Sequence, residues 1–128
     1  MKKLILLALL FSAIPAVSYA GSWAEYFNTK QIPPITLLNS DKNLVKLDNG
    51  TYAFRFHGII QNQSNVKLNF INAEFAFIDQ HGYPASVHNQ LVAYIMEPSQ
   101  LKEVYVEKII IPVGGSELVD AQFNLRWS

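Results

Sequence analysis

The side chains best suited to metal binding or acid–base chemistry in this chain are three histidines. His81 and His88 lie on either side of a turn, so pairing of the flanking strands would bring them near one another, and Asp79 would add a carboxylate ligand. His57 falls on the polar side of an earlier stretch. None of these spacings is diagnostic of a metal site, and the simpler interpretation places all three histidines on the surface.

Two glutamates are the other candidates for chemistry. Glu103 and Glu107 are four residues apart, but in a strand they share one exposed face with Tyr105. The paired carboxylates of a glycosidase must instead face each other across a cleft. The chain has no cysteine, which excludes thiolate chemistry, and no serine-hydrolase or zinc-protease motif is present. The sequence therefore predicts no catalytic residue, no metal ligand and no cofactor, and hence a protein that is not an enzyme.

Residues 1–20 have the pattern of a cleaved secretory signal. Lys2 and Lys3 precede an apolar run from residue 4 to residue 11, and Ser18-Tyr19-Ala20 places small residues where a signal peptidase reads them. The run is too short to span a bilayer, and no second apolar stretch follows. We expect cleavage after Ala20, and a bacterial protein of the periplasm or the cell exterior that does not span the membrane.

The remaining chain, about 108 residues long, suits a single domain. Without Lys2 and Lys3 it carries eight basic and ten acidic side chains, a formal charge of −2. Such a nearly neutral chain lacks the basic patch that nucleic acid requires. Without disulfides, its stability must come from packing.

Alternating apolar residues predict a β-structure from Leu44 onward. Tyr52, Phe54 and Phe56 share one face of a strand, and Asp48-Asn49-Gly50 before them is typical of a hairpin turn. Strands are expected at residues 44–47, 52–61, 67–79, 87–96, 104–111 and 118–127. Residues 67–79 are apolar on both faces, which indicates a central strand. We predict a small immunoglobulin-like antiparallel β-sandwich of about six or seven strands over residues 44–128, after an irregular segment at 21–43.

Two short motifs resemble the FxLYD domain, an immunoglobulin-like module of exported bacterial proteins. One is Phe75-Ala76-Phe77-Ile78-Asp79 followed by Gly82, and the other is Gly58-Ile59-Ile60-Gln61-Asn62 followed by Ser64. Together they cover roughly residues 52–111. Phe77 and Ile78 replace the leucine and tyrosine of the family pattern. The resemblance implies the fold rather than an activity. Turn chemistry independently predicts that Asp79 and Asn62 hydrogen-bond to turn backbone and that Gly82 takes a positive φ.

These observations favour a non-catalytic module that binds another protein in the envelope or outside the cell, as an accessory subunit of a larger assembly. A small sandwich leaves strand edges that accept a partner's strand. The candidate partner-binding residues are Trp23, Tyr26, Phe27, Pro33 and Pro34. The simpler alternative for the aromatic residues is that they pack onto the sandwich.

Two other functions stay open at this point. One is a periplasmic carrier that holds a small ligand between its sheets, or a metal at the histidine pair. The other is a secreted hydrolase or inhibitor-like effector. The oligomeric state does not follow from the sequence.

Overall fold

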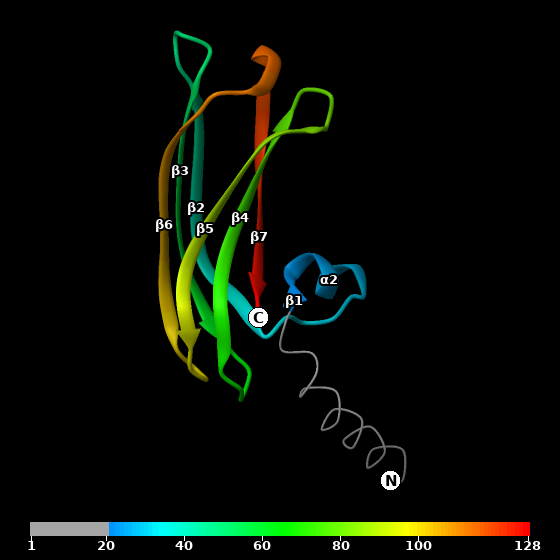
Figure 1. Ribbon diagram of the computed structural model, residues 1–128, viewed down its shortest axis with the longest axis vertical. Coiled ribbons are helices and arrows are strands. Elements are labelled where there is room, and N and C mark those ends of the chain that lie inside the picture. Colours follow the sequence, from blue (N-terminus) through cyan, green and yellow to red (C-terminus); the bar gives the residue numbers. More distant parts are fainter. Residues whose placement is uncertain (1–20) are drawn as a thin grey trace.

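Over residues 21–128 the protein is a two-layer sandwich of antiparallel strands with one short helix at its side (Figure 1). The computed structural model describes residues 21–128, so the predicted signal peptide lies outside the described residues. In chain order the elements are β1 Gly21–Ser22, α2 Trp23–Asn28, β2 Ile35–Lys46, β3 Tyr52–Asn62, β4 Leu68–Asp79, β5 Pro84–Met96, β6 Leu101–Ile110, a 3-10 turn Val113–Gly115 and β7 Leu118–Trp127.

The seven strands form one sheet of four and one of three. The four-stranded sheet has the order β1-β7-β4-β5, and the three-stranded sheet has the order β2-β3-β6. All neighbouring strands are antiparallel. The predicted fold class is therefore confirmed, and β4 lies between two other strands, as its apolar faces indicated.

The interior is filled by phenylalanine rings from both sheets. Phe54 lies 5.1 Å from Phe75 and 4.9 Å from Phe77, measured between ring centroids. Phe56 lies 5.1 Å from Phe75 and stacks on Phe123 at 4.7 Å. These contacts arise because every second residue of β3 and β4 points into the sandwich. The rings occupy the space between the sheets where a ligand pocket was considered.

The turns use the residues that the sequence indicated. Gly50 has φ 79° in the β2–β3 hairpin and Gly82 has φ 86° after β4, conformations that favour glycine. The Asp79 carboxylate accepts hydrogen bonds from the backbone N–H groups of His81, at 2.9 Å, and Tyr83, at 3.0 Å. Asp79 and Gly82 therefore have the structural roles predicted for them.

Asn62 is completely buried at the end of β3. Its Nδ2 donates to the carbonyl oxygens of Val66, at 2.8 Å, and Met96, at 3.0 Å. Its Oδ1 accepts from the backbone N–H of Ser64, at 3.0 Å, and from the Ser64 hydroxyl, at 2.7 Å. One side chain thus joins the β3–β4 turn to the end of β5.

The prediction of an irregular segment at residues 21–43 was wrong. β2 begins at Ile35, not at residue 44, and residues 23–28 form α2. β2 is an edge strand that is exposed along most of its length, so it needs no apolar face and shows no alternation in sequence. α2 begins after Ser22, whose hydroxyl accepts a hydrogen bond from the Glu25 N–H at 3.4 Å.

Candidate interaction surface

A sandwich of two open sheets has four edges, and here they differ in how they are protected. β5 and β1 are at the ends of the four-stranded sheet, and β2 and β6 are at the ends of the three-stranded sheet. An edge strand offers unpaired backbone groups to another chain unless charge, capping or covering prevents it. Comparing the four edges therefore shows where a partner strand can bind.

The β6 and β2 edges are protected by charge. Four charged side chains lie on β6, namely Lys102, Glu103, Glu107 and Lys108. Three lie on β2, namely Asp41, Lys42 and Lys46. In addition, the side chain of Gln90 on β5 donates from Nε2 to the carbonyl oxygen of Tyr105, at 3.3 Å, so one backbone acceptor of β6 already has a partner.

The edge beside β7 is covered by the start of the described chain. Gly21 and Ser22 pair with Trp127 and Arg126, and α2 follows immediately. Further along β7, Lys42 Nζ crosses from the other sheet and donates to the carbonyl oxygen of Ala121 at 2.7 Å. This edge is therefore protected in two ways: β1 and α2 cover it, and the charged side chain of Lys42 occupies a backbone acceptor.

The β5 edge has neither protection. β5 is the longest strand, at 13 residues, and no Asp, Glu, Lys or Arg occurs between Asp79 and Glu97. Val87, Asn89 and Leu91 pair with residues of β4 that point away from the core, so they lie on the outer face of the sheet. Val87 is 59% exposed and Leu91 is 40% exposed. This edge is apolar and uncharged, and no further strand pairs with it, although β6 lies beside it at Gln90.

Two bulges limit the regular part of β5. The register with β4 shifts between Ser86 and Pro84 and again between Ala93 and Leu91. Bulges twist an edge strand and interrupt its pairing. Regular pairing with β4 is left over residues 86–91, which is the segment most suited to receive another strand.

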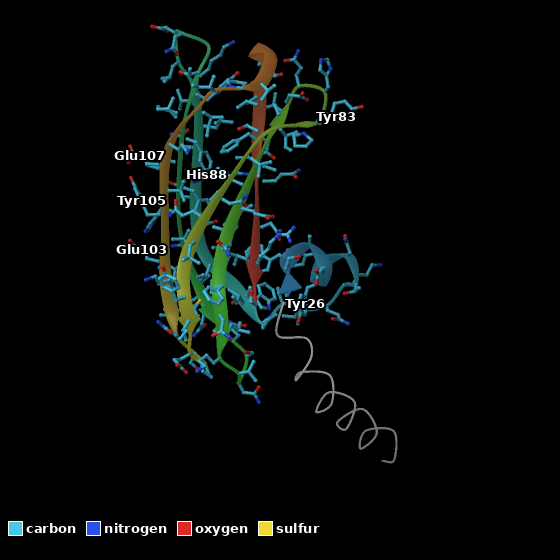
Figure 2. The ribbon with its side chains drawn as sticks, in the orientation of Figure 1. Tyr26, Tyr83, His88, Glu103, Tyr105 and Glu107 are labelled. Atoms are coloured by element: carbon cyan, nitrogen blue, oxygen red, sulfur yellow. The ribbon has the colours of Figure 1, made fainter. Side chains whose placement is uncertain are left out.

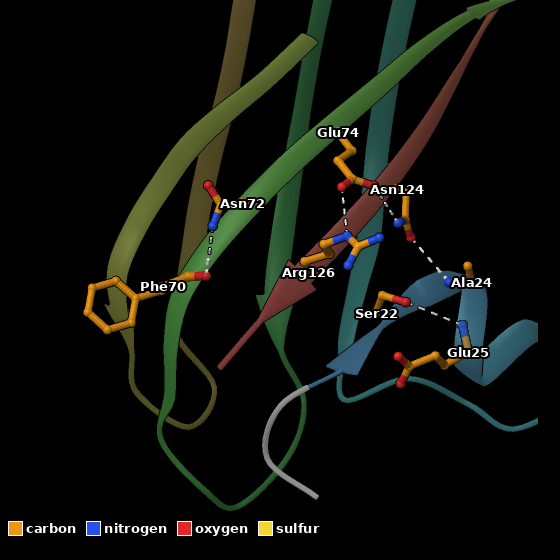
Figure 3. Close-up of polar contacts among 8 residues, drawn as sticks. All are labelled: Ser22, Ala24, Glu25, Phe70, Asn72, Glu74, Asn124 and Arg126. Carbon is orange, nitrogen blue, oxygen red and sulfur yellow. Dashed lines mark hydrogen bonds and ion pairs between the residues drawn. The ribbon is translucent and has the colours of Figure 1, made fainter. Parts of the chain in front are cut away.

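Exposed aromatic rings extend this surface toward the end of β5. Tyr94 is 69% exposed and its ring lies edge-on to that of Phe70 on β4, with 6.2 Å between centroids. Phe70 has φ 49°, a left-handed conformation that is unfavourable for an aromatic residue. The Asn72 amide donates to the Phe70 carbonyl oxygen at 3.3 Å (Figure 3). The chain thus holds an unfavourable backbone conformation that leaves an aromatic ring exposed.

A polar network lies on the same outer face, between β4, β7 and α2 (Figure 3). Arg126 Nε is 2.6 Å from a carboxylate oxygen of Glu74, and the Asn124 Nδ2 donates to the other oxygen at 2.9 Å. The Asn124 Oδ1 accepts from the N–H of Ala24 at 3.2 Å. An open groove is lined by Glu74 and Asn124 of this network together with Phe27 and Val87. This groove is where a small ligand would find both apolar and polar groups.

Trp23 and Tyr26 pack onto the sandwich and do not project as a docking cluster. Trp23 is buried, donates from Nε1 to the Ile35 carbonyl oxygen at 2.8 Å, and lies 5.2 Å from the Phe123 ring. Tyr26 is on α2 at the side of the sandwich (Figure 2), and its ring centroid is 5.7 Å from that of Trp127. Only Phe27, which is 57% exposed, remains available at the surface.

The two prolines are likewise part of the connection between α2 and β2. Pro33 is buried and Pro34 is half-buried, and the Pro34 carbonyl oxygen accepts a hydrogen bond from the Gln63 N–H at 2.7 Å. Among the five residues proposed for partner binding, Phe27 is therefore the one whose side chain is largely exposed. The uncharged β5 edge was not singled out, although the lack of charge over residues 80–96 was visible in the sequence.

The histidines lie in separate places. His81 is at the exposed tip of the β4–β5 turn. His88 is farther along β5 (Figure 2), where it pairs with Phe75, and the two ring centroids are 6.5 Å apart. His57 lies on the other sheet, with Nε2 3.4 Å from a carboxylate oxygen of Glu103. Over residues 21–128 no three histidine, aspartate or glutamate side chains gather as a metal site would require.

The glutamates of β6 share an exposed face with Tyr105, as expected (Figure 2). The Tyr105 hydroxyl donates to Glu107 at 2.7 Å. Because this hydrogen bond favours the neutral phenol, it raises the pKa of Tyr105 above its usual value. Glu103 instead lies beside His57, so the two glutamates have different partners and do not face each other.

No family model matches the chain, and no curated protein matches it either. Among solved structures, it is similar to a β-glucuronidase of glycoside hydrolase family 2, with a TM-score of 0.53 and 11% identity. The match covers 72% of this chain but only 12% of the glucuronidase chain. At this identity the similarity shows the β-sandwich fold alone. The resemblance to FxLYD domains stays a prediction. Within the described part of the chain, no helix is long and apolar enough to cross a membrane.

Proposed function

We propose that this protein is an exported, non-catalytic β-sandwich module that binds another protein in the bacterial envelope or outside the cell. The observation that carries the proposal is the β5 edge, which is uncharged, pairs with no further strand and is flanked by exposed apolar side chains. Backbone hydrogen bonds to an edge strand supply affinity, and contacts with alternate side chains supply specificity. The export pattern of residues 1–20 gives the compartment of this proposal.

The side chains of β5 define what such a partner strand requires. On the outer face it would meet Val87, Asn89 and Leu91, and on the core side it would meet His88 and Gln90. A complementary strand therefore has apolar residues at two positions of one face, with polar residues between them. It needs no particular charge, because β5 has none.

A photo-crosslinking scan along β5 tests this proposal. The crosslinking amino acid is placed at Val87, Asn89 and Leu91 in turn, in the full chain expressed in its native host with its own N-terminal segment. Ile109 on β6 is the matched control, because it is also exposed on an edge strand but directly follows the charged residues Glu107 and Lys108. Captured peptides are identified by mass spectrometry.

If the partner pairs as a strand, the position that is captured in the partner depends regularly on the position of the probe in β5. When the probe moves two residues along β5, the captured position in the partner moves two residues in the opposite or the same direction. Capture at β5 with such a regular shift, and not at Ile109, supports the proposal. Equal capture at both strands, or no capture from β5, contradicts it.

A further inference from the structure

We infer that the strand which pairs with β5 is β5 of a second copy of this chain, related by a two-fold axis at Asn89. The inference rests on the proposed function, because it takes β5 as the docking edge and names the strand that occupies it. It follows from the order of side chains along the regular segment, residues 86–91. The same edge in both copies makes a closed, symmetric interface.

The geometry of antiparallel strands limits where the axis can be. Directly opposed residues point to the same face of a sheet, so two copies of one strand pair about a single residue. An axis at Asn89 places Val87 of one copy opposite Leu91 of the other, on the outer face. An axis at His88 would instead place Val87 opposite Asn89, an apolar group against an amide. Of these two arrangements, only the axis at Asn89 places apolar residues opposite apolar residues and the amide opposite an amide.

The self-pairing is complementary over residues 87–91; Ser86, at the end of the regular segment, would oppose Val92 at the bulge. Two Val87–Leu91 pairs enclose an Asn89–Asn89 pair on the outer face, and His88 faces Gln90 on the core side. Cross-strand pairs of apolar residues and of amides are favourable, whereas like charges in direct opposition are unfavourable. Because no Asp, Glu, Lys or Arg occurs in β5, the pairing opposes no like charges between the two strands.

The β6 edge shows the opposite pattern. An axis at Tyr105 would place Glu103 against Glu107 and Lys102 against Lys108, so like charges would oppose each other at four positions. The charges of β6 therefore disfavour this symmetric pairing, while β5 permits its own. Pairing through β5 joins the two four-stranded sheets into one continuous sheet.

Sedimentation velocity tests the dimer and its axis together. The exported protein, expressed with its own residues 1–20, is measured over about 1 to 300 µM, since a short strand pair belongs to the weak class of interfaces. Asn89→Lys and Asn89→Glu each place like charges opposite one another across the axis, so each variant alone is expected to weaken dimerisation about five- to tenfold. An equimolar mixture of the two opposes unlike charges and is expected to restore it.

The controls separate this inference from the proposed function. Ile109→Lys adds the same charge to the β6 edge and is expected to leave the dimer unchanged. A protein that stays monomeric at all concentrations, or a mixture that does not restore association, overturns the inference. Capture of a different protein at β5 by a monomeric chain also overturns it, while the proposed function stands. Concentration-dependent dimers that are lost in both single variants and recovered in the mixture support it.

Discussion

Replacing Asn62 with alanine is expected to destabilise the fold far more than its position in a turn suggests. The side chain is fully buried and makes four hydrogen bonds, two donated and two accepted. In the variant the single proton of the Ser64 hydroxyl, freed from Asn62, donates to the Val66 carbonyl oxygen at 3.1 Å, so two groups lack a replacement partner: the Met96 carbonyl oxygen and the Ser64 N–H. At about 1.5 kcal/mol for each group left without a partner, the free energy of unfolding should fall by about 3 kcal/mol.

Asn49→Ala is the matched control for this prediction. Asn49 Oδ1 accepts hydrogen bonds from the N–H and the hydroxyl of Thr51, the same pattern that Asn62 makes with Ser64. Asn49 is exposed, however, and makes no bond comparable to that between Asn62 and Met96. Its replacement should cost less than about 1 kcal/mol.

Equilibrium unfolding in urea, followed by tryptophan fluorescence, measures both variants, because Trp23 and Trp127 are buried. A loss of about 3 kcal/mol corresponds to a fall in melting temperature of about 10–15 °C for a domain of this size. Equal losses for Asn62→Ala and Asn49→Ala would refute the argument from burial.

Four further substitutions test other parts of the fold. Trp23→Ala should lower the free energy of unfolding by about 3–5 kcal/mol, because the ring is buried against the sandwich, whereas Phe27→Ala should cost less than about 1 kcal/mol; urea unfolding compares them. Gly58→Val should cost about 1–3 kcal/mol in the same assay, since a Cβ at this position would lie 3.0 Å from neighbouring side chains. The hydrogen bond from Lys42 lowers the pKa of Asp120 below its usual 3.8, so this pair stabilises the fold above that pH and the effect is lost as the pH falls through the lowered pKa. Both side chains are about half exposed, so wild type and Asp120→Asn should differ by only about 0.5 kcal/mol at pH 6, and the difference should shrink as the pH falls below 3.8.

The strands that face the core could be predicted from the sequence because burial of one face imposes alternation. β3, β4 and β7 all show it, and β7 was predicted with its observed bounds. The hairpin glycines were predictable for a similar reason, since a positive φ strongly favours glycine. Core-facing strands and tight turns could therefore be predicted, because burial and backbone conformation restrict which residue types occur there.

The elements that the sequence did not reveal are those that the core does not constrain. β2 is an exposed edge strand, and its start at Ile35 leaves no periodic signal. α2 has only six residues, too few for a helical period, although Ser22 followed by Glu25 is a capping pattern that would have indicated its start. Trp23 and Phe27 belong to the same short helix, and only the three-dimensional arrangement separates the buried ring from the exposed one.

The sequence could predict that a strand edge is the candidate interaction surface, but not which of the four edges it is. That a small sandwich has edges able to bind a strand follows from the fold class. Which edge is free depends on contacts between segments far apart in the chain, such as Lys42 with Ala121 and Gln90 with Tyr105. Such contacts leave no mark in a single sequence.

The strand order also has a consequence for how the chain folds. β7 is the last of the seven strands, yet it lies inside its sheet, between β4 and β1. Folding proceeding from the N-terminal end would leave β4 unpaired on one side, and Phe75 without its neighbour Phe123, until residues near 127 are available. Pairing of segments so distant in sequence makes closure slow, in the range of milliseconds to seconds. A chain that folds only when nearly all of it is present stays extended for longer, which suits the passage across a membrane that we propose for it.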